Sequence, residues 1–175
     1  MKALVAYSSR TGNTRMIADA IAPVLPGEVE TVSVECAPQT LDHDFVAIGF
    51  WVDKGVPDEQ AQEFMKRIRG TVVGLFGTLG AWPDSDHARE CMESAVRMME
   101  ENDNRVICRF MCQGKVDPQV VEAMARYAPE RHPMTPERKA RLEEAAKHPD
   151  ETDTMNAATV FSAAVKEHFA LAGRS

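Results

Sequence analysis

Short apolar runs separated by longer amphipathic stretches recur through the first two-thirds of the chain. Four of these runs have the length and composition of buried strands, and a further segment, 29–34, alternates Val with Thr and Ser as a strand at a sheet edge does. Parallel strands need long crossover connections, usually helical, so this succession of strands and amphipathic stretches predicts an α/β fold with a parallel sheet and helices on both faces. The expected strands are 3–7, 29–34, 44–50, 71–77 and 106–111, and the expected helices between them begin near Asn13, Pro57 and Asp84.

The last third of the chain has a different pattern. A helix is expected from Asp117, with Val120, Val121 and Met124 facing inward. A breaker-rich stretch and a charged helical piece, 137–147, follow, and 137–153 is expected to be mostly solvated. The last helix, 152–172, carries an apolar stripe that should pack on the sheet: Ala157, Val160, Phe161, Ala164, Val165 and Phe169. With 175 residues and no internal repeat, we predict a single domain over 1–175, in which 113–175 is a divergent helical segment.

Charge and cysteine content exclude several classes of protein. The net charge of −7 argues against a nucleic-acid binder, which needs Lys and Arg to neutralise phosphates, and suits a redox partner with a basic docking face. No apolar stretch approaches the length of a membrane span, and the N-terminal apolar stretch, 3–7, is shorter than the apolar region of a secretory signal peptide. The four cysteines form no C-x-x-C pair, and Cys108 and Cys112 lie in an apolar run. We therefore expect buried free thiols, no metal site and a reducing, cytoplasmic setting.

The segment Ser8–Thr14, with the sequence SSRTGNT, directly follows the first expected strand and opens a helix. Backbone N–H groups at a helix N-terminus have no internal partner and carry a positive partial charge, so they bind anions. Ser9, Thr11 and Thr14 add hydroxyl groups, and Gly12 allows close backbone approach. The P-loop pattern G-x-x-x-x-G-K-[ST] and the dinucleotide pattern G-x-G-x-x-G are both absent. A short hydroxyl-rich loop of this kind suits the phosphate of a mononucleotide, and the alternative is an ordinary capped helix start.

Ser9-Arg10-Thr11-Gly12-Asn13-Thr14 resembles the T/S-x-T-G-N-T phosphate loop of flavodoxins. This resemblance covers roughly residues 1–112 and implies a flavodoxin-like three-layer sandwich with strand order 2-1-3-4-5 and FMN at the point where the order reverses. Arg10 departs from the usual neutral residue, and we expect it to point to solvent rather than to the phosphate. The chain also looks like a divergent flavodoxin-like subgroup of anaerobic bacteria, some members of which accompany bilirubin reductase.

A flavin ring needs two further loops, after the third and fourth strands, and each candidate loop carries one of the two tryptophans. Gly80 and Ala81 are small enough for backbone amides to approach the ring edge. By analogy with flavodoxins, a peptide near Gly55 accepts a hydrogen bond from N5 of the reduced flavin. The expected cofactor-binding residues are Ser9, Arg10, Thr11, Gly12, Asn13 and Thr14 in the first loop, Trp51, Val52, Asp53, Lys54 and Gly55 in the second, and Thr78, Leu79, Gly80, Ala81 and Trp82 in the third.

Three functions are compatible with this pattern. The leading one is an FMN-dependent electron carrier, in which the cofactor does the chemistry and no catalytic acid–base pair is needed. The second is an FMN-dependent reductase of a quinone, tetrapyrrole or similar planar acceptor, for which Lys54 and the C-terminal segment would shape a substrate site. The third is a receiver-like signalling module, which the absence of clustered Asp after the first strand disfavours.

Overall fold

The computed structural model describes residues 1–127, 129–130 and 133–172, so residues 173–175 of the predicted domain lie outside the described residues. Its sheet has five parallel strands in the order β2-β1-β3-β5-β6, and a short strand, β4, pairs antiparallel with β3. The strands are β1 (Lys2–Tyr7), β2 (Glu28–Ser33), β3 (Phe45–Asp53), β4 (Val56–Pro57), β5 (Val72–Leu79) and β6 (Arg105–Gln113). The helices are α1 (Asn13–Ile21), α2 (Glu59–Met65), α3 (Asp86–Glu100), α4 (Pro118–Tyr127), α5 (Pro136–Ala145) and α6 (Glu151–Ala172), with 3₁₀ turns at Ala22–Val24 and Val34–Cys36.

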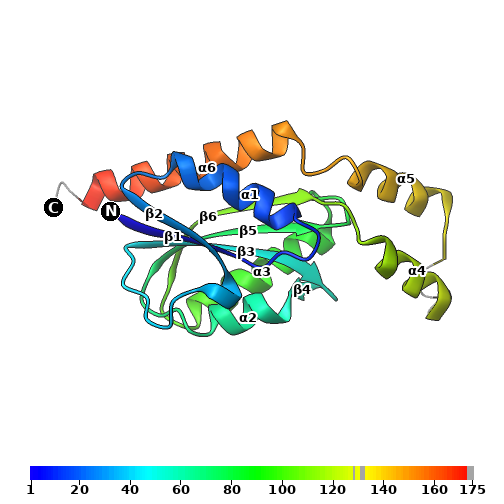
Figure 1. The fold of residues 1–175 in the computed structure, drawn as a ribbon, viewed down its shortest axis with the longest axis horizontal. Helices are drawn as coiled ribbons and strands as arrows, with labels where there is room; N and C mark the ends of the chain where they lie inside the picture. The colour runs from blue at the N-terminus through cyan, green and yellow to red at the C-terminus, as the bar shows by residue number, and fades with distance from the viewer. Residues whose placement is uncertain (128, 131–132, 173–175) are drawn as a thin grey trace.

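Helices cover both faces of the sheet and make three layers (Figure 1). On one face α1 and α6 bury a cluster that includes Ile17, Phe45, Phe76 and Phe161. On the other face α2 and α3 contribute to a second cluster, which includes Phe64. The α/β class, the parallel sheet and its strand order are therefore confirmed.

Several predicted boundaries are wrong, and local chemistry explains them. Pro23 has no backbone N–H, so α1 ends at Ile21 and the chain continues as a 3₁₀ turn. The third strand continues to Asp53 instead of ending at residue 50. Pro57 lies in β4 rather than in the first turn of a helix, and the carboxylate of Asp58 caps α2.

The segment between β6 and α6 lies beyond the carboxyl-terminal edge of the sheet (Figure 1). None of the residues of α4 is fully buried: Val120 and Val121 are half-buried and Met124 is 37% exposed, so the predicted inward face is confirmed only in part. The helix is amphipathic, but it extends past the sheet that would cover it. Ala145 in α5 is buried, so 137–153 is only partly solvated.

The stripe of α6 is confirmed at its centre, because Ala157, Phe161 and Val165 are fully buried. The assignment of Val160 to this stripe is wrong, because Val160 is 37% exposed. Cys108 and Cys112 are buried free thiols, as expected, and Cys91 is a third. Within the described residues, no helix combines the length and the apolar character that a membrane span requires.

Candidate functional site

The first turn of α1 presents backbone amides at the edge of the sheet. Its N-cap, Gly12, adopts a left-handed conformation with φ 89° and provides no side-chain cap. By contrast, α2, α3 and α5 are each capped by the side chain of their own N-cap residue. A Cβ atom on Gly12 would meet nothing within 4 Å, so there is open space beside this turn. Within this turn the Arg15 N–H is bonded to the Ser9 hydroxyl, and the open space beside Gly12 and the preceding amides fits an anionic group.

The hydroxyl groups of this loop divide into two sets. The Thr14 and Thr78 hydroxyls lie 3.0 Å apart in a buried contact between α1 and β5. Both were predicted to contact the cofactor, but each already has a partner. Ser9 Oγ accepts the Arg15 N–H at 3.3 Å and keeps its own proton to donate, while Thr11 is exposed and donates weakly, at 3.4 Å, to the Lys115 carbonyl. The hydroxyls nearest solvent are therefore those of Ser9 and Thr11.

Arg10 is exposed, in line with our expectation, and its guanidinium is held by two neighbours. Its Nε and Nη2 atoms both lie 3.1 Å from Oδ2 of Asp117, and its guanidinium carbon is 5.8 Å from the centroid of the Trp51 ring. The other oxygen of Asp117 accepts the Gln119 N–H at 2.9 Å and caps α4. Arg10 thus links the phosphate loop, the end of β3 and the start of the C-terminal segment.

The second predicted loop is a β-hairpin. Trp51, Val52 and Asp53 belong to β3, and Lys54 and Gly55 form the two-residue turn into β4. Both turn residues have positive φ, 50° and 87°, as a type I′ hairpin turn requires. Trp51 is half-buried at the end of β3, beside Arg10, and Lys54 is exposed at the tip. This arrangement gives the aromatic ring a rigid support at the edge of the sheet.

The third predicted loop follows β5, and the two residues at the end of that strand, Thr78 and Leu79, are buried. Trp82 is 46% exposed. A Cβ on Gly80 would lie 2.3 Å from Cγ2 of Val116, so the missing side chain makes room for the C-terminal segment rather than for a ligand. Gly80 and Ala81 themselves are half-buried.

The chain between β6 and α4 closes against the first loop. The Asn13 side-chain amide donates to the Lys115 carbonyl at 3.0 Å, and a Cβ on Gly114 would lie 2.5 Å from that amide nitrogen. The Gly114 N–H donates to the Leu79 carbonyl at 2.9 Å. The three predicted loops therefore meet at one edge, with residues 114–117 as a fourth component that the sequence pattern did not indicate.

Asp58 is a site residue that sequence reasoning missed. Its side chain is 2% exposed and receives the Ser8 hydroxyl at 2.6 Å and the Trp51 and Ala61 N–H groups at 3.2 Å each. Burial raises the pKa of this carboxyl, while the three hydrogen bonds act in the opposite direction. The sequence signals only a helix cap here, because Ser8 lies 50 positions away along the chain.

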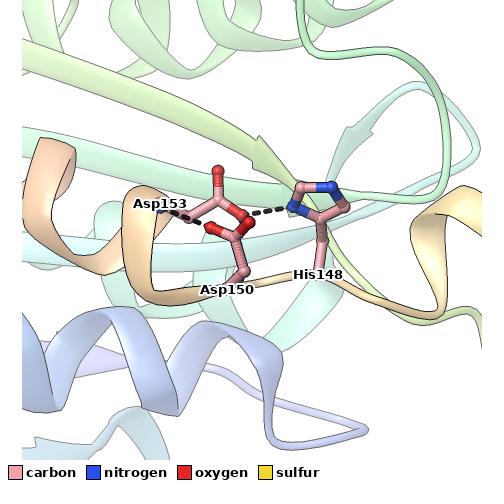
Figure 2. A group of neighbouring side chains, drawn as sticks. All are labelled: His148, Asp150 and Asp153. Atoms are coloured by element: carbon pink, nitrogen blue, oxygen red, sulfur yellow. Dashed lines mark hydrogen bonds and ion pairs between the residues drawn. The ribbon is translucent and has the colours of Figure 1, made fainter.

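A second group of titratable side chains lies at the start of α6 (Figure 2). His148 Nδ1 is 2.5 Å from Oδ2 of Asp153, the Asp153 N–H donates to the Asp150 carboxylate at 2.9 Å, and the Asp150 N–H donates to Asp153 at 3.0 Å. Possible ligand atoms of the three lie within 4.8 Å of one another. Reciprocal capping of the helix and one ion pair account for the cluster, so we assign no metal to it.

The His148–Asp153 pair is expected to make stability pH-dependent. Its hydrogen bond to Asp153 raises the pKa of His148, so the pair stabilises the fold fully below the unfolded-state pKa of 6.5 and this stabilisation is lost as the pH rises through the folded-state value. His148→Gln should lose about 1 kcal/mol of unfolding free energy near pH 6 and much less near pH 9. Urea denaturation at both pH values measures this. The same deficit at both would contradict it.

The fold defines the class of protein: a doubly wound α/β domain in which the loop 8–14 lies at the point where the strand order reverses. A family model described as "Flavodoxin domain" matches residues 4–162, and the chain belongs to this family. Membership supports a flavin-binding redox protein.

Named relatives and solved structures agree with this family. The chain is 31% identical over 164 residues to the flavodoxin-like domain-containing protein BilS of Clostridioides difficile strain CD3, covering 90% of this chain and 92% of that protein. It is 31% identical over 173 residues to BilS of Clostridium symbiosum strain WAL-14163, covering 87% and 90%. Oxidised flavodoxin 2 from Bacillus cereus has the same fold, with a TM-score of 0.62, 19% identity and 96% and 99% coverage.

Proposed function

We propose that the chain binds one FMN at the carboxyl-terminal edge of its sheet and carries electrons between redox partners. The observation that carries this proposal is the first turn of α1, where Gly12 supplies no side-chain cap and the space beside the Ser9 and Thr11 hydroxyls is open. Arg10 adds a guanidinium to this loop, where Asp117 holds it, in a chain of net charge −7. A phosphate monoester suits such a set of donors.

The flavin ring would lie between the end of β3 and the loop after β5. Trp51 and the exposed Trp82 supply flat apolar surfaces at these two places. When bound, FMN supplies one- and two-electron chemistry, and the chain binds it, orients it and limits access of water. The net charge of −7 favours redox partners with a basic docking face, because complementary fields speed encounter.

A titration tests this function. Apoprotein added to FMN should quench flavin fluorescence with one-to-one saturation, and riboflavin, which lacks the phosphate, should bind at least about tenfold more weakly, since each charged hydrogen bond lost costs about 1.5 kcal/mol or more. Flavin that stays fully fluorescent, or equal affinity for the two ligands, would contradict the proposal.

A second candidate is an FMN-dependent reductase of a planar acceptor such as a quinone or tetrapyrrole. The feature that favours it is the segment α4–α5, which stands beyond the flavin edge and exposes Met124, Tyr127 and Met134. Turnover of reduced nicotinamide with a panel of such acceptors separates the candidates. Sustained turnover supports the reductase, and its absence from a protein that binds FMN supports the carrier.

A further inference from the structure

Asp58 is the buried charged group that the proposed function leaves without a role. Two observations single it out. First, its side chain is almost fully buried. Second, its two carboxylate oxygens accept hydrogen bonds from two separate parts of the site: the Ser8 hydroxyl of the loop 8–14 and the Trp51 N–H at the end of β3. The Asp58 N–H also donates to the Trp51 carbonyl at 3.0 Å, so the contact with β3 is reciprocal.

The hydrogen-bond pattern requires a carboxylate at this position. Oδ1 accepts from the Ala61 N–H and from the Ser8 hydroxyl, and Oδ2 accepts from the Trp51 N–H. An asparagine has only one acceptor oxygen, so in either orientation of its amide one backbone N–H would face an NH₂ group. Asparagine would serve α2 equally well as a cap, which means that capping alone does not explain the acid.

We propose that Asp58 is a positioning residue of the cofactor site, which fixes the loop 8–14 against the end of β3 at Trp51 and places a buried negative charge at the edge of the sheet where FMN is proposed to bind. This inference rests on the proposed function. The hydrogen bonds of Asp58 to Ser8 and Trp51 would set the spacing between the loop that holds the phosphate and the Trp51 ring that supports the flavin. The charge disfavours the addition of electrons nearby, because Coulomb interactions are weakly screened in the interior, and it therefore lowers the reduction potential.

Asp58→Asn tests both parts. It should bind FMN about tenfold more weakly, the loss expected when a buried N–H is left without an acceptor, and any bound flavin should have a more positive midpoint potential. Ser8→Ala removes one of these hydrogen bonds and keeps the charge, so it should weaken FMN binding and leave the potential unchanged. Glu59→Gln, a matched loss of one charge at the exposed neighbouring position, should change neither.

The apoprotein gives a further readout without flavin. Amide hydrogen exchange at Trp51 should be faster in Asp58→Asn than in the wild type. In one orientation of the asparagine amide the Trp51 N–H loses its acceptor, and in the other the loss of the Ala61 hydrogen bond loosens the side chain that holds it. Wild-type exchange, affinity and potential in Asp58→Asn, beside a wild type that binds FMN, would overturn this inference and leave the proposed function intact. A wild type that fails to quench FMN would overturn the proposed function and this inference together.

Discussion

Phe161→Ala is expected to lower the free energy of unfolding by about 3–5 kcal/mol, the usual cost of emptying the site of a buried aromatic side chain. Phe161 is fully buried on α6 and makes edge-to-face contacts with Phe45 and Phe76, at ring-centroid distances of 6.4 and 5.8 Å. Gly74 in the sheet leaves room for the Phe161 ring, because a Cβ at this position would lie 2.6 Å from the ring. Chemical denaturation monitored by circular dichroism measures the loss.

Val160→Ala is the matched control for this substitution. Val160 precedes Phe161 in the same helix but is 37% exposed, so its truncation should cost less than about 1 kcal/mol. A Phe161→Ala protein no less stable than Val160→Ala would mean that α6 does not depend on this contact with the sheet. The comparison also tests which residues of α6 pack on the sheet, because Phe161 is buried and Val160 is exposed.

The sequence was a good guide wherever a local pattern carries the information. Four apolar runs, and for β2 the alternation of Val with Thr and Ser, predicted each of the five parallel strands within a few residues, because both patterns are local. The strand order came from the resemblance of the SRTGNT loop to flavodoxins and not from the pattern of runs. The β3–β4 hairpin was missed since Lys54 is an unusual residue at positive φ and Pro57 an unusual one in a strand.

The contacts that organise the candidate site join residues far apart in the chain, which no local spacing reveals. Ser8 and Asp58 are 50 positions apart, and Arg10 and Asp117 are 107 positions apart. Each residue has an ordinary local explanation, as a loop hydroxyl, a helix cap or an exposed cation. Their shared role follows only from the way the sheet brings the ends of β1, β3, β5 and β6 to one edge. The inward face predicted for α4 is covered only in part for a related reason, since amphipathicity does not say whether a partner layer is present.

Gly49→Ala is expected to damage the core and the phosphate loop together, because Gly49 touches both. It lies in β3, where a Cβ would be 2.3 Å from Cε2 and 2.4 Å from Cζ of the buried Phe76 ring and 2.9 Å from Cγ2 of Thr14. The Gly49 carbonyl also accepts the Ser8 N–H at 2.9 Å. Overpacking of this kind costs about 1–3 kcal/mol, and we expect the upper part of this range because the ring has no free space to enter. FMN affinity should fall as Ser8 and Thr14 shift, which a fluorescence titration of the folded variant measures.

A double-mutant cycle with Phe76→Leu identifies the cause. Leucine lacks the Cε2 and Cζ atoms that the new methyl group would strike, so it should make room for alanine at position 49. Phe76→Leu alone leaves a cavity, but the double variant should be more stable than the sum of the two single losses predicts, with a favourable coupling of about 1 kcal/mol or more. Strictly additive losses would mean that the ring is not what excludes a side chain from Gly49. Recovery of FMN affinity in the double variant would trace the binding defect to the same contact, since relief of the Phe76 overlap would return β3 and the first turn of α1 to their native separation.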